Sequence, residues 1–335
     1  MNILSPVPTG SGVEVLHNAL AAGIDGYHVR RYSPWRSVFP PALIGLSSRR
    51  ADLIHASADY GVFFARAGVP LVATLHNYTS DLFMRDYSSS LQYLHYRTDL
   101  RWFSRLTFKR ATVVVAISQF IAQLATKDLQ TDAPVRLIYN GVDHTLFVPG
   151  KAKTTSWPFR VLFCGNLNRR KRAQLLPSLA AALGNGFEIH YTAGLSDGAL
   201  DLPGAGRGVL RPLGRIKHAD MPAVYRSMDV LFMPSVREGF GLCVAEAMAC
   251  GLPVVACRES AMPELVEAGR GGTLCPVDDV ACYADAIRRL ADDRVSARRM
   301  GEFNRGRIEE QFTQVRMIEE YRALFESVRD GEFNR

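Results

Sequence analysis

The 335 residues include 47% hydrophobic side chains, which can fill two cores of ordinary size, so the composition excludes a disordered chain and favours two globular domains. The formal net charge of +7 suggests a polyanionic neighbour, although a surplus of this size is common and no nucleic-acid-binding module accompanies it. There is no run of 18 apolar residues and no basic segment before the first predicted strand. We therefore expect neither a membrane span nor a signal peptide, and a cytosolic protein.

The first half of the chain alternates short apolar runs with intervals long enough for helices. Such runs are typical of parallel strands that are covered on both faces by helices, so they predict an α/β domain. The predicted strands are 2–5, 52–55, 71–75, 112–117 and 135–139.

Two features of this half lie where parallel sheets build ligand sites, at the carboxyl ends of strands. The turn Gly10, Ser11 and Gly12 joins the first strand to a helix, and His76 directly follows the third strand. Turns of this kind also occur merely to reverse the chain, and a single histidine is more often structural than catalytic. Both readings stay open at this point.

A basic, aromatic-rich segment spans 87–110, where cations recur every four residues at Arg97, Arg101, Arg105 and Lys109. This spacing stacks them along one face of a helix. Such a helix can lie on an anionic membrane surface, with its cations at the headgroups. Alternatively, its rings pack in the domain core and its arginines are simply solvated.

The polar, proline-bounded segment 149–158 predicts a linker, with a first domain at 1–150 and a second at 159–312. The second half repeats the alternation of the first: strands are predicted at 160–164 and 187–192, and helices at 175–183, 221–228 and 281–291. Between the first of these strands and its helix stand Asn166 and the cations Arg169, Arg170, Lys171 and Arg172. Four cations at a helix N-terminus oppose the helix dipole and favour a nearby anion, although charge runs are usually solvated loops.

The central stretch of the second half runs from Arg237 to Gly251, between apolar strands at 230–235 and 252–257. A glycine-rich turn opens a helix over 242–250, and its backbone N–H groups favour an anion. Glu238 lies in the turn, and Glu246 is the one carboxylate of an otherwise apolar helix. A buried carboxylate needs a partner, either a hydroxyl or basic side chain of the core or a bound ligand. The glycine turn makes us favour the ligand.

Glu238 and Glu246 with Gly-Phe-Gly between them, followed by Ala-Met-Ala-Cys-Gly-Leu-Pro-Val-Val, resemble the E-x7-E signature of the retaining GT-B glycosyltransferases of family four. The resemblance implies two Rossmann-like, doubly wound parallel-sheet domains that face each other across a cleft. It implies an acceptor on the first domain, a nucleotide sugar on the second, and a last helix within 313–335 that returns to the first domain.

The resemblance also assigns roles to residues. It places Glu238 and His76 beside the donor sugar, Glu246 at the ribose hydroxyls, and Lys171 at the diphosphate. Asn166 replaces an arginine of the family, so either Arg169 or Arg170 supplies the missing charge, or the diphosphate binds more weakly than is usual in the family. Backbone groups complete the implied site: those of Gly239, Phe240, Gly241 and Leu242 hold sugar and diphosphate, those of Arg215 and Ile216 face the base, and the loop Gly10, Ser11 and Gly12 approaches the phosphates and the acceptor.

No Asp-x-Asp triplet occurs, so we expect no metal and no cofactor, with cations and helix amides stabilising the departing diphosphate instead. The implied activity is retaining transfer from a UDP- or GDP-linked sugar to an acceptor such as a lipid-linked or cell-envelope glycan. A nucleotide-sugar epimerase and a non-catalytic nucleotide-sugar-binding subunit are the alternatives. The six cysteines lack a Cys-x2-Cys pair and are interpreted as reduced core residues.

Overall fold

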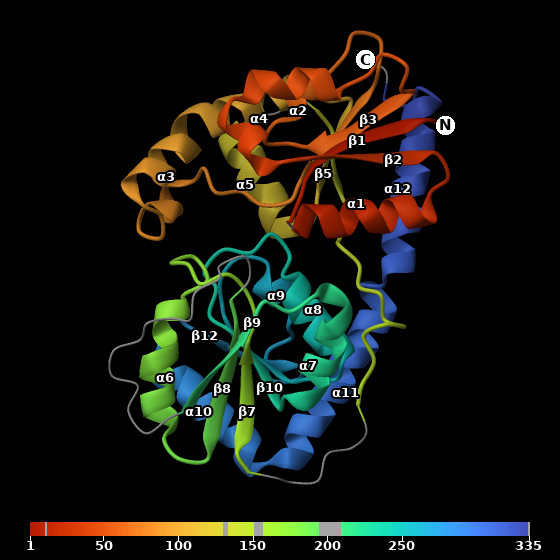
Figure 1. Cartoon of the computed structure of the whole chain (residues 1–335). Helices are drawn as coiled ribbons and strands as arrows, with labels where there is room; N and C mark the ends of the chain where they lie inside the picture. Colours follow the sequence, from red (N-terminus) through yellow and green to blue (C-terminus); the bar gives the residue numbers. More distant parts are fainter. Residues whose placement is uncertain (11, 130–132, 151–156, 194–208, 334–335) are drawn as a thin grey trace. The chain divides into compact units, whose positions relative to one another are not determined.

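The computed structural model describes residues 1–10, 12–129, 133–150, 157–193 and 209–333. The chain divides into two compact units (Figure 1). Unit 1 comprises Met1–Gly141 and Gln314–Arg335, and unit 2 comprises Val142–Thr313.

The described part of unit 1 contains a six-stranded, all-parallel sheet in the order β2-β1-β3-β4-β5-β6. The strands are β1 (Ile3–Pro8), β2 (Tyr27–Tyr32), β3 (Leu53–Ser57), β4 (Leu71–Leu75), β5 (Val113–Ala116) and β6 (Val135–Leu137). The five predicted strands are confirmed. β2 is not apparent from the sequence, because this edge strand carries exposed polar side chains, His28 and Arg30 among them, that interrupt the apolar pattern.

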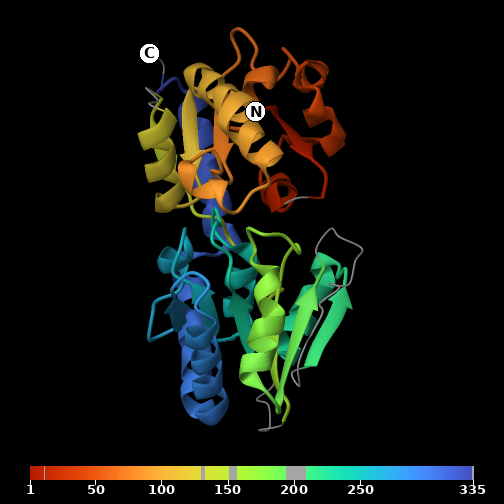
Figure 2. The same ribbon diagram turned by 90° about the vertical axis from the view of Figure 1, so that its left-hand side faces the viewer.

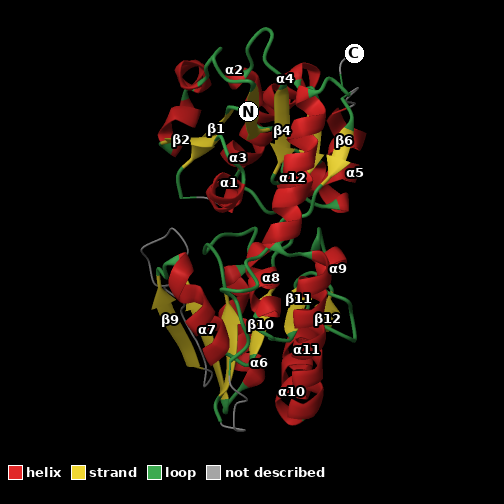
Figure 3. Ribbon diagram, turned by 90° about the vertical axis from the view of Figure 1, so that its right-hand side faces the viewer, coloured by secondary structure: helices red, strands yellow, loops and turns green. Residues whose placement is uncertain are grey.

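Helices cover both faces of this sheet. On one face α1 (Gly12–Gly23) and α12 (Gln314–Arg329) pack together on β1, β3, β4 and β5, and on the other lie α4 (Arg101–Arg110) and α5 (Gln119–Leu129), as seen in Figures 1 and 3. The alternation along β4 shows why: Val72 points into the first core and Ala73 into the second. The remaining helical segments are η1 (Pro34–Val38), η2 (Pro40–Leu46), α2 (Gly61–Phe64), η3 (Leu82–Arg85), α3 (Ser90–His95) and η4 (Tyr96–Leu100).

Unit 2 contains a second all-parallel sheet, with six described strands in the order β12-β11-β10-β7-β8-β9. The strands are β7 (Phe159–Phe163), β8 (Phe187–Thr192), β9 (Val209–Gly214), β10 (Val230–Met233), β11 (Val254–Cys257) and β12 (Gly272–Cys275). On one face lie α6 (Leu176–Leu183) and α10 (Val280–Asp292), which Figure 2 shows in front of the sheet. The other helical segments are η5 (Ala173–Leu175), η6 (His218–Asp220), α7 (Met221–Ser227), α8 (Leu242–Ala249), α9 (Met262–Leu265) and α11 (Arg294–Gln311).

The interpretation of all six cysteines as reduced is wrong for one pair. Cys275, the last residue of β12, forms a disulfide with Cys282 in the first turn of α10. Their Cα atoms lie 5.9 Å apart, within the usual range for a disulfide, because the chain turns back between strand and helix. The other four cysteines, Cys164, Cys243, Cys250 and Cys257, are free thiols.

None of the helices described here is both long and apolar enough to cross a membrane.

Candidate active site

The glycine-rich turn of unit 2 connects the carboxyl end of β10 to α8. Gly241 adopts a left-handed conformation (φ +99°), and a Cβ atom there would come within 2.6 Å of Met262 Cε, so the turn requires a glycine. The helix therefore starts at Leu242 with its first backbone N–H groups lacking helical partners. Within the preceding turn, Phe240 is buried against the ring of Phe312, with 5.6 Å between ring centroids.

Glu238 lies at the start of this turn, and its carboxylate contacts two cations from the loop after β7. Its Oε1 is 2.7 Å from Lys171 Nζ and 3.3 Å from Arg170 Nη1, and it also accepts a hydrogen bond from the Ser235 hydroxyl. The backbone N–H of Glu238 donates to Ser260 Oγ at 3.0 Å. Burial would raise the pKa of Glu238, but Lys171 and Arg170 outweigh it and lower the pKa, so the carboxylate is charged.

Lys171 reaches Glu238 because the loop after β7 provides room for its side chain. Gly165 directly follows Cys164 at the strand end, and a Cβ atom on it would come within 3.3 Å of Lys171 Cε. The backbone N–H of Lys171 donates to Asn168 Oδ1 at 2.9 Å, which closes the loop. A glycine and a local side-chain cap thus position the buried ammonium group.

The four cations of this loop separate into two groups. Arg170 and Lys171 meet Glu238, and Arg170 also donates to the carbonyl of Arg237. Arg169 is exposed, and its side chain has no partner in the ranges described above. Arg172 pairs with Asp278. The structure thus brings Arg170, and not Arg169, into the cluster, and Asn166 is half-buried in the same loop.

Glu246 lies one helical turn inside α8 and is buried. Its Oε2 accepts a hydrogen bond from the Tyr225 hydroxyl, and its Oε1 accepts one from His218 Nε2, both at 2.8 Å. These are the two kinds of core partner that the sequence left open, a hydroxyl and a basic side chain. The hydrogen bond to Glu246 raises the pKa of His218, against partial burial.

Neither partner of Glu246 is apparent from the sequence. Tyr225 lies in α7 and His218 in η6, so neither is near Glu246 in the chain. One signal was available for His218: it follows Arg215 and Ile216 by two or three residues, in the loop that leaves β9. Arg215 is exposed and Ile216 half-buried, so the predicted base-binding loop leads directly to the partner of Glu246.

The remaining predicted site residues lie in unit 1. His76 follows β4 and is half-buried, and burial lowers its pKa to about 4. Gly10 has φ +78°, and its N–H donates to Glu14 Oε2 at 2.8 Å. Gly12 is the first residue of α1, and Ser11 lies outside the described residues.

The basic segment forms α3, the π-helical turn η4 and α4, but its cations are not a solvated stripe. Arg97 donates to the Ser80 carbonyl at 2.8 Å, and both Arg101 and Arg105 bind Asp128. Only Lys109 of the four predicted cations is fully exposed. Arg97, Arg101 and Arg105 are therefore half-buried and not simply solvated, because carboxylate and carbonyl oxygens of unit 1 bind their guanidinium groups. That this segment contacts a membrane stays a prediction.

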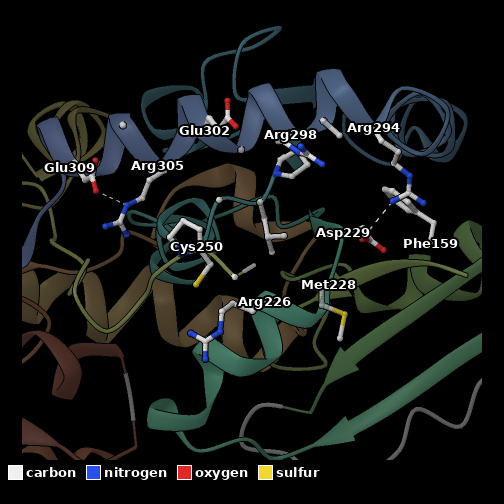
Figure 4. Close-up of a pocket in the computed structure, with 18 residues that line it drawn as sticks. Phe159, Arg226, Met228, Asp229, Cys250, Arg294, Arg298, Glu302, Arg305 and Glu309 are labelled. Atoms are coloured by element: carbon white, nitrogen blue, oxygen red, sulfur yellow. Dashed lines mark hydrogen bonds and ion pairs between the residues drawn. The ribbon is translucent and has the colours of Figure 1, made fainter. Parts of the chain in front are cut away.

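A cavity of about 480 Å³ lies in unit 2 between α11 and the amino ends of the strands (Figure 4). Phe159, which begins β7, and Asp229, which precedes β10, line it together with Arg226, Arg298 and Cys250. Glu238 and Lys171 follow the carboxyl ends of the same strands, so this cavity is at the opposite edge of the sheet. Throughout the described ranges, no cluster of three or more His, Cys, Asp or Glu side chains is arranged to hold a metal ion.

Two family profiles match most of the chain. The profile described as "Glycosyltransferase Family 4" matches residues 8–146, and the one described as "Glycosyl transferases group 1" matches residues 158–293. Among curated proteins, D-inositol 3-phosphate glycosyltransferase of Corynebacterium jeikeium is 31% identical over 57% of this chain and 51% of its own length. The corresponding enzyme of Arthrobacter is 30% identical over 75% of this chain and 65% of its own. The chain thus spans less than two thirds of either relative.

Solved structures share the fold over nearly the whole chain. Sucrose-phosphate synthase from Thermosynechococcus elongatus superimposes with a TM-score of 0.82 at 21% identity, covering 98% of this chain and 99% of the other. The Anabaena HepE protein in complex with UDP-glucose gives a TM-score of 0.79 at 22% identity, covering 98% of this chain and 100% of the other. Both similarities concern the fold.

Proposed function

We propose that this chain, which belongs to the group 1, family 4 glycosyltransferases of GT-B fold, transfers a sugar from a nucleoside-diphosphate sugar to an acceptor, with retention of configuration and without a metal ion. The observation that carries this proposal is the cluster of Lys171, Arg170 and Glu238 beside the N-terminus of α8. A buried ammonium, a guanidinium and unpaired helix amides converge there, which suits a diphosphate.

This cluster acts on the difficult step of the reaction. When the bond between the sugar C1 and the diphosphate oxygen breaks, its electron pair stays on the diphosphate, where negative charge develops. Lys171 and Arg170 stabilise that charge electrostatically, together with the N-terminus of α8. Glu238 is held ionised by the same two cations and orients the sugar beside them.

Glu246 would bind the ribose of the donor. Its two oxygens already accept hydrogen bonds from Tyr225 and His218, so the carboxylate is preformed as an acceptor for hydroxyl groups. Ribose hydroxyls would replace or share these donors. The base would lie by the backbone of Arg215 and Ile216, and the UDP-glucose of HepE makes a uridine donor the first to test, with guanosine second.

The acceptor is proposed to be a lipid-linked or cell-envelope glycan, reached from the cytoplasmic face of an anionic membrane. The support lies in the helices of the basic segment, where Leu91 and Trp102 are 78% and 59% exposed and Lys109 adds an exposed cation. Exposed apolar side chains and an exposed cation along one helical segment suit a bilayer surface. The half-buried arginines of this segment, Arg97, Arg101 and Arg105, would then act by holding the helices in place.

A thermal-shift panel of UDP, GDP, ADP, CDP and dTDP, with and without chelator, tests the donor site. Ligand at 100 times its Kd contributes about 2.7 kcal/mol, which raises the Tm by roughly 5 °C. We expect one nucleotide to stabilise the protein whether or not chelator is present. No shift with any nucleotide would count against the donor site, and a shift that chelator abolishes would reject metal independence.

A turnover assay distinguishes sugar transfer from the two alternatives, an epimerase and a non-catalytic binding subunit. Lys171→Ala is expected to lower kcat by about 10²-fold or more, as for the loss of one preorganised electrostatic group. Arg172→Ala is the matched control, because that cation of the same loop pairs with Asp278 instead. Release of free sugar or an epimer without an acceptor would indicate an epimerase, and nucleotide binding without any turnover a non-catalytic subunit.

A further inference from the structure

Unit 1 contains a cluster of three histidines that the proposed function uses only in part. His17 comes from α1, His55 from β3, and His76 follows β4. His17 and His55 are fully buried, and the ring of His17 lies 4.5 Å from that of His55 and 5.5 Å from that of His76 between centroids. Buried polar atoms are nearly always hydrogen-bonded, so each polar atom of this cluster should have a partner.

The hydrogen bonds form one continuous chain. At its inner end, Tyr321 OH lies 3.2 Å from Thr74 Oγ1, which lies 2.7 Å from His55 Nε2. The other nitrogen of that ring, His55 Nδ1, lies 2.6 Å from Tyr27 OH, and Tyr27 OH lies 2.6 Å from His17 Nδ1. At the outer end, His17 Nε2 lies 3.4 Å from His76 Nε2. Ser5 Oγ also contacts His17 Nδ1 at 2.7 Å, and its hydroxyl can donate or accept there.

Both inner histidines are neutral. Burial, followed by the neighbouring imidazoles, lowers the pKa of His17 and His55 well below its usual value. A neutral imidazole has one N–H donor and one acceptor nitrogen, and both nitrogens of each ring are used. The hydrogens of the whole chain must therefore point in one direction, either toward His76 or away from it.

The Tyr321 end of this chain of hydrogen bonds decides between the two directions. If the hydrogens pointed away from His76, Thr74 would donate to Tyr321, and the Tyr321 hydroxyl hydrogen would need a further acceptor. Tyr321 is fully buried, and Thr74 is its one hydrogen-bond partner within the described residues. A buried donor without an acceptor is costly, so Tyr321 donates inward. Each link then follows as far as Tyr27. The described residues give the Tyr27 and Ser5 hydroxyl hydrogens no acceptor besides each other and His17 Nδ1, so one of the two is donated to His17 Nδ1. His17 Nε2–H therefore donates to His76 Nε2.

We infer that His17, His55, Tyr27 and Thr74 are positioning residues that keep His76 in its Nδ1–H tautomer, so that His76 offers the donor sugar a hydrogen-bond donor and not a base. Nδ1 is the one ring nitrogen of His76 that this chain of hydrogen bonds leaves available. The inference rests on the proposed function for the identity of the sugar, but the tautomer itself is a property of unit 1.

The tautomer is measurable without any substrate. In protein labelled with ¹⁵N-histidine, long-range ¹H–¹⁵N spectra distinguish Nδ1–H from Nε2–H imidazoles, and the spectrum of His76→Gln identifies the His76 signals. We expect His76 to carry its hydrogen on Nδ1. A hydrogen on Nε2 in the wild-type protein would overturn the inference, whether or not the enzyme is active.

Tyr27→Phe combined with Ser5→Ala removes both hydroxyl groups that contact His17 Nδ1, and so interrupts this chain of hydrogen bonds in its middle, far from His76 in the sequence. We expect His76 to become a mixture of tautomers and kcat to fall about tenfold, with the KM for the donor unchanged. Tyr32→Phe is the matched control: Tyr32 ends the same strand, is equally buried, and lies outside the chain of hydrogen bonds, so tautomer and kcat should match the wild type. A wild-type tautomer in the protein that carries both Ser5→Ala and Tyr27→Phe would overturn the inference.

Substitution of His76 itself gives an independent measurement. The side-chain amide of asparagine places an N–H near the position of Nδ1, whereas glutamine reaches the position of Nε2. We therefore expect His76→Asn to retain at least fivefold more kcat than His76→Gln. The reverse order would overturn the inference. If no variant and no wild-type protein turns over any donor, the proposed function fails, while the spectra still decide the tautomer.

Discussion

Lys171→Met is the substitution whose outcome the structure defines best. Methionine keeps most of the apolar stem of lysine and removes the ammonium group that lies 2.7 Å from Glu238 Oε1. The two side chains are 10% and 11% exposed, so solvent screens the pair little. Removing one partner of a buried ion pair costs about 3–5 kcal/mol, because the other charge stays buried. Arg170 at 3.3 Å remains as a partner of Glu238, so we expect a smaller loss than this, about 2–3 kcal/mol.

The assay is thermal unfolding of the wild type and the variant as a function of pH. At neutral pH the expected loss corresponds to a decrease in Tm of roughly 5–10 °C for a unit of this size. The pKa of Glu238 in the folded protein is lowered from its usual value of 4.5. The pairing therefore stabilises the folded state above pH 4.5, and this contribution is lost as the pH falls through the folded pKa. The difference in Tm should shrink accordingly below pH 4.5.

Arg172→Met provides the comparison. Arg172 stands next to Lys171, but its partner Asp278 is 39% exposed, and pairs of this kind contribute about 0–1 kcal/mol. The control should change the Tm by roughly 3 °C or less. An equal decrease in Tm for Lys171→Met at neutral and acidic pH would refute the reasoning, because the loss would then come from packing of the side chain and not from its charge.

Three further predictions use other parts of the molecule. Glu246→Ala should weaken nucleotide binding in calorimetry more than Glu238→Ala, since only Glu246 is assigned to ribose, and equal affinities would reject that division. The pKa of His218 is raised above 6.5, so its pairing with Glu246 stabilises the fold below that pH and the contribution is lost as the pH rises through the folded pKa. The difference in Tm between wild type and His218→Gln should therefore decrease toward alkaline pH, and a constant difference would contradict the ion pair. Replacing Leu91 and Trp102 with serine should abolish sedimentation with anionic vesicles and leave donor turnover in solution unchanged. Unchanged sedimentation would exclude this surface as the membrane contact.

Much of the fold could be predicted because its strands are apolar on both faces. β4 was predicted with the observed bounds, since every residue of Leu71–Leu75 is buried. β2 and β9 were missed for the opposite reason. Both are edge strands with exposed residues, and β9 also contains Pro212, which breaks the expected pattern.

The candidate site was predictable to the extent that it is local in sequence. The turn with Glu238 and the helix with Glu246 lie within one stretch, so their spacing and burial could be read directly. The partners of Glu246 could not be predicted, because α7 and η6 are distant from Glu246 in the sequence and meet it only in the folded chain. The contacts of Arg101 with Asp128 were missed for the same reason, as a helical repeat shows which side chains share a face but not what that face meets.

The order in which the chain is synthesised adds a constraint on His76. Tyr321 belongs to α12, whose buried side chains complete the core of unit 1, yet all of unit 2 precedes α12 in the chain. At about 5–20 residues per second, a ribosome takes on the order of ten to thirty seconds to make unit 2. During that interval the first 141 residues lack part of their core and the donor that orients the histidines. Unit 2, contiguous in sequence, can finish folding first, and His76 acquires its tautomer only when the last helix docks.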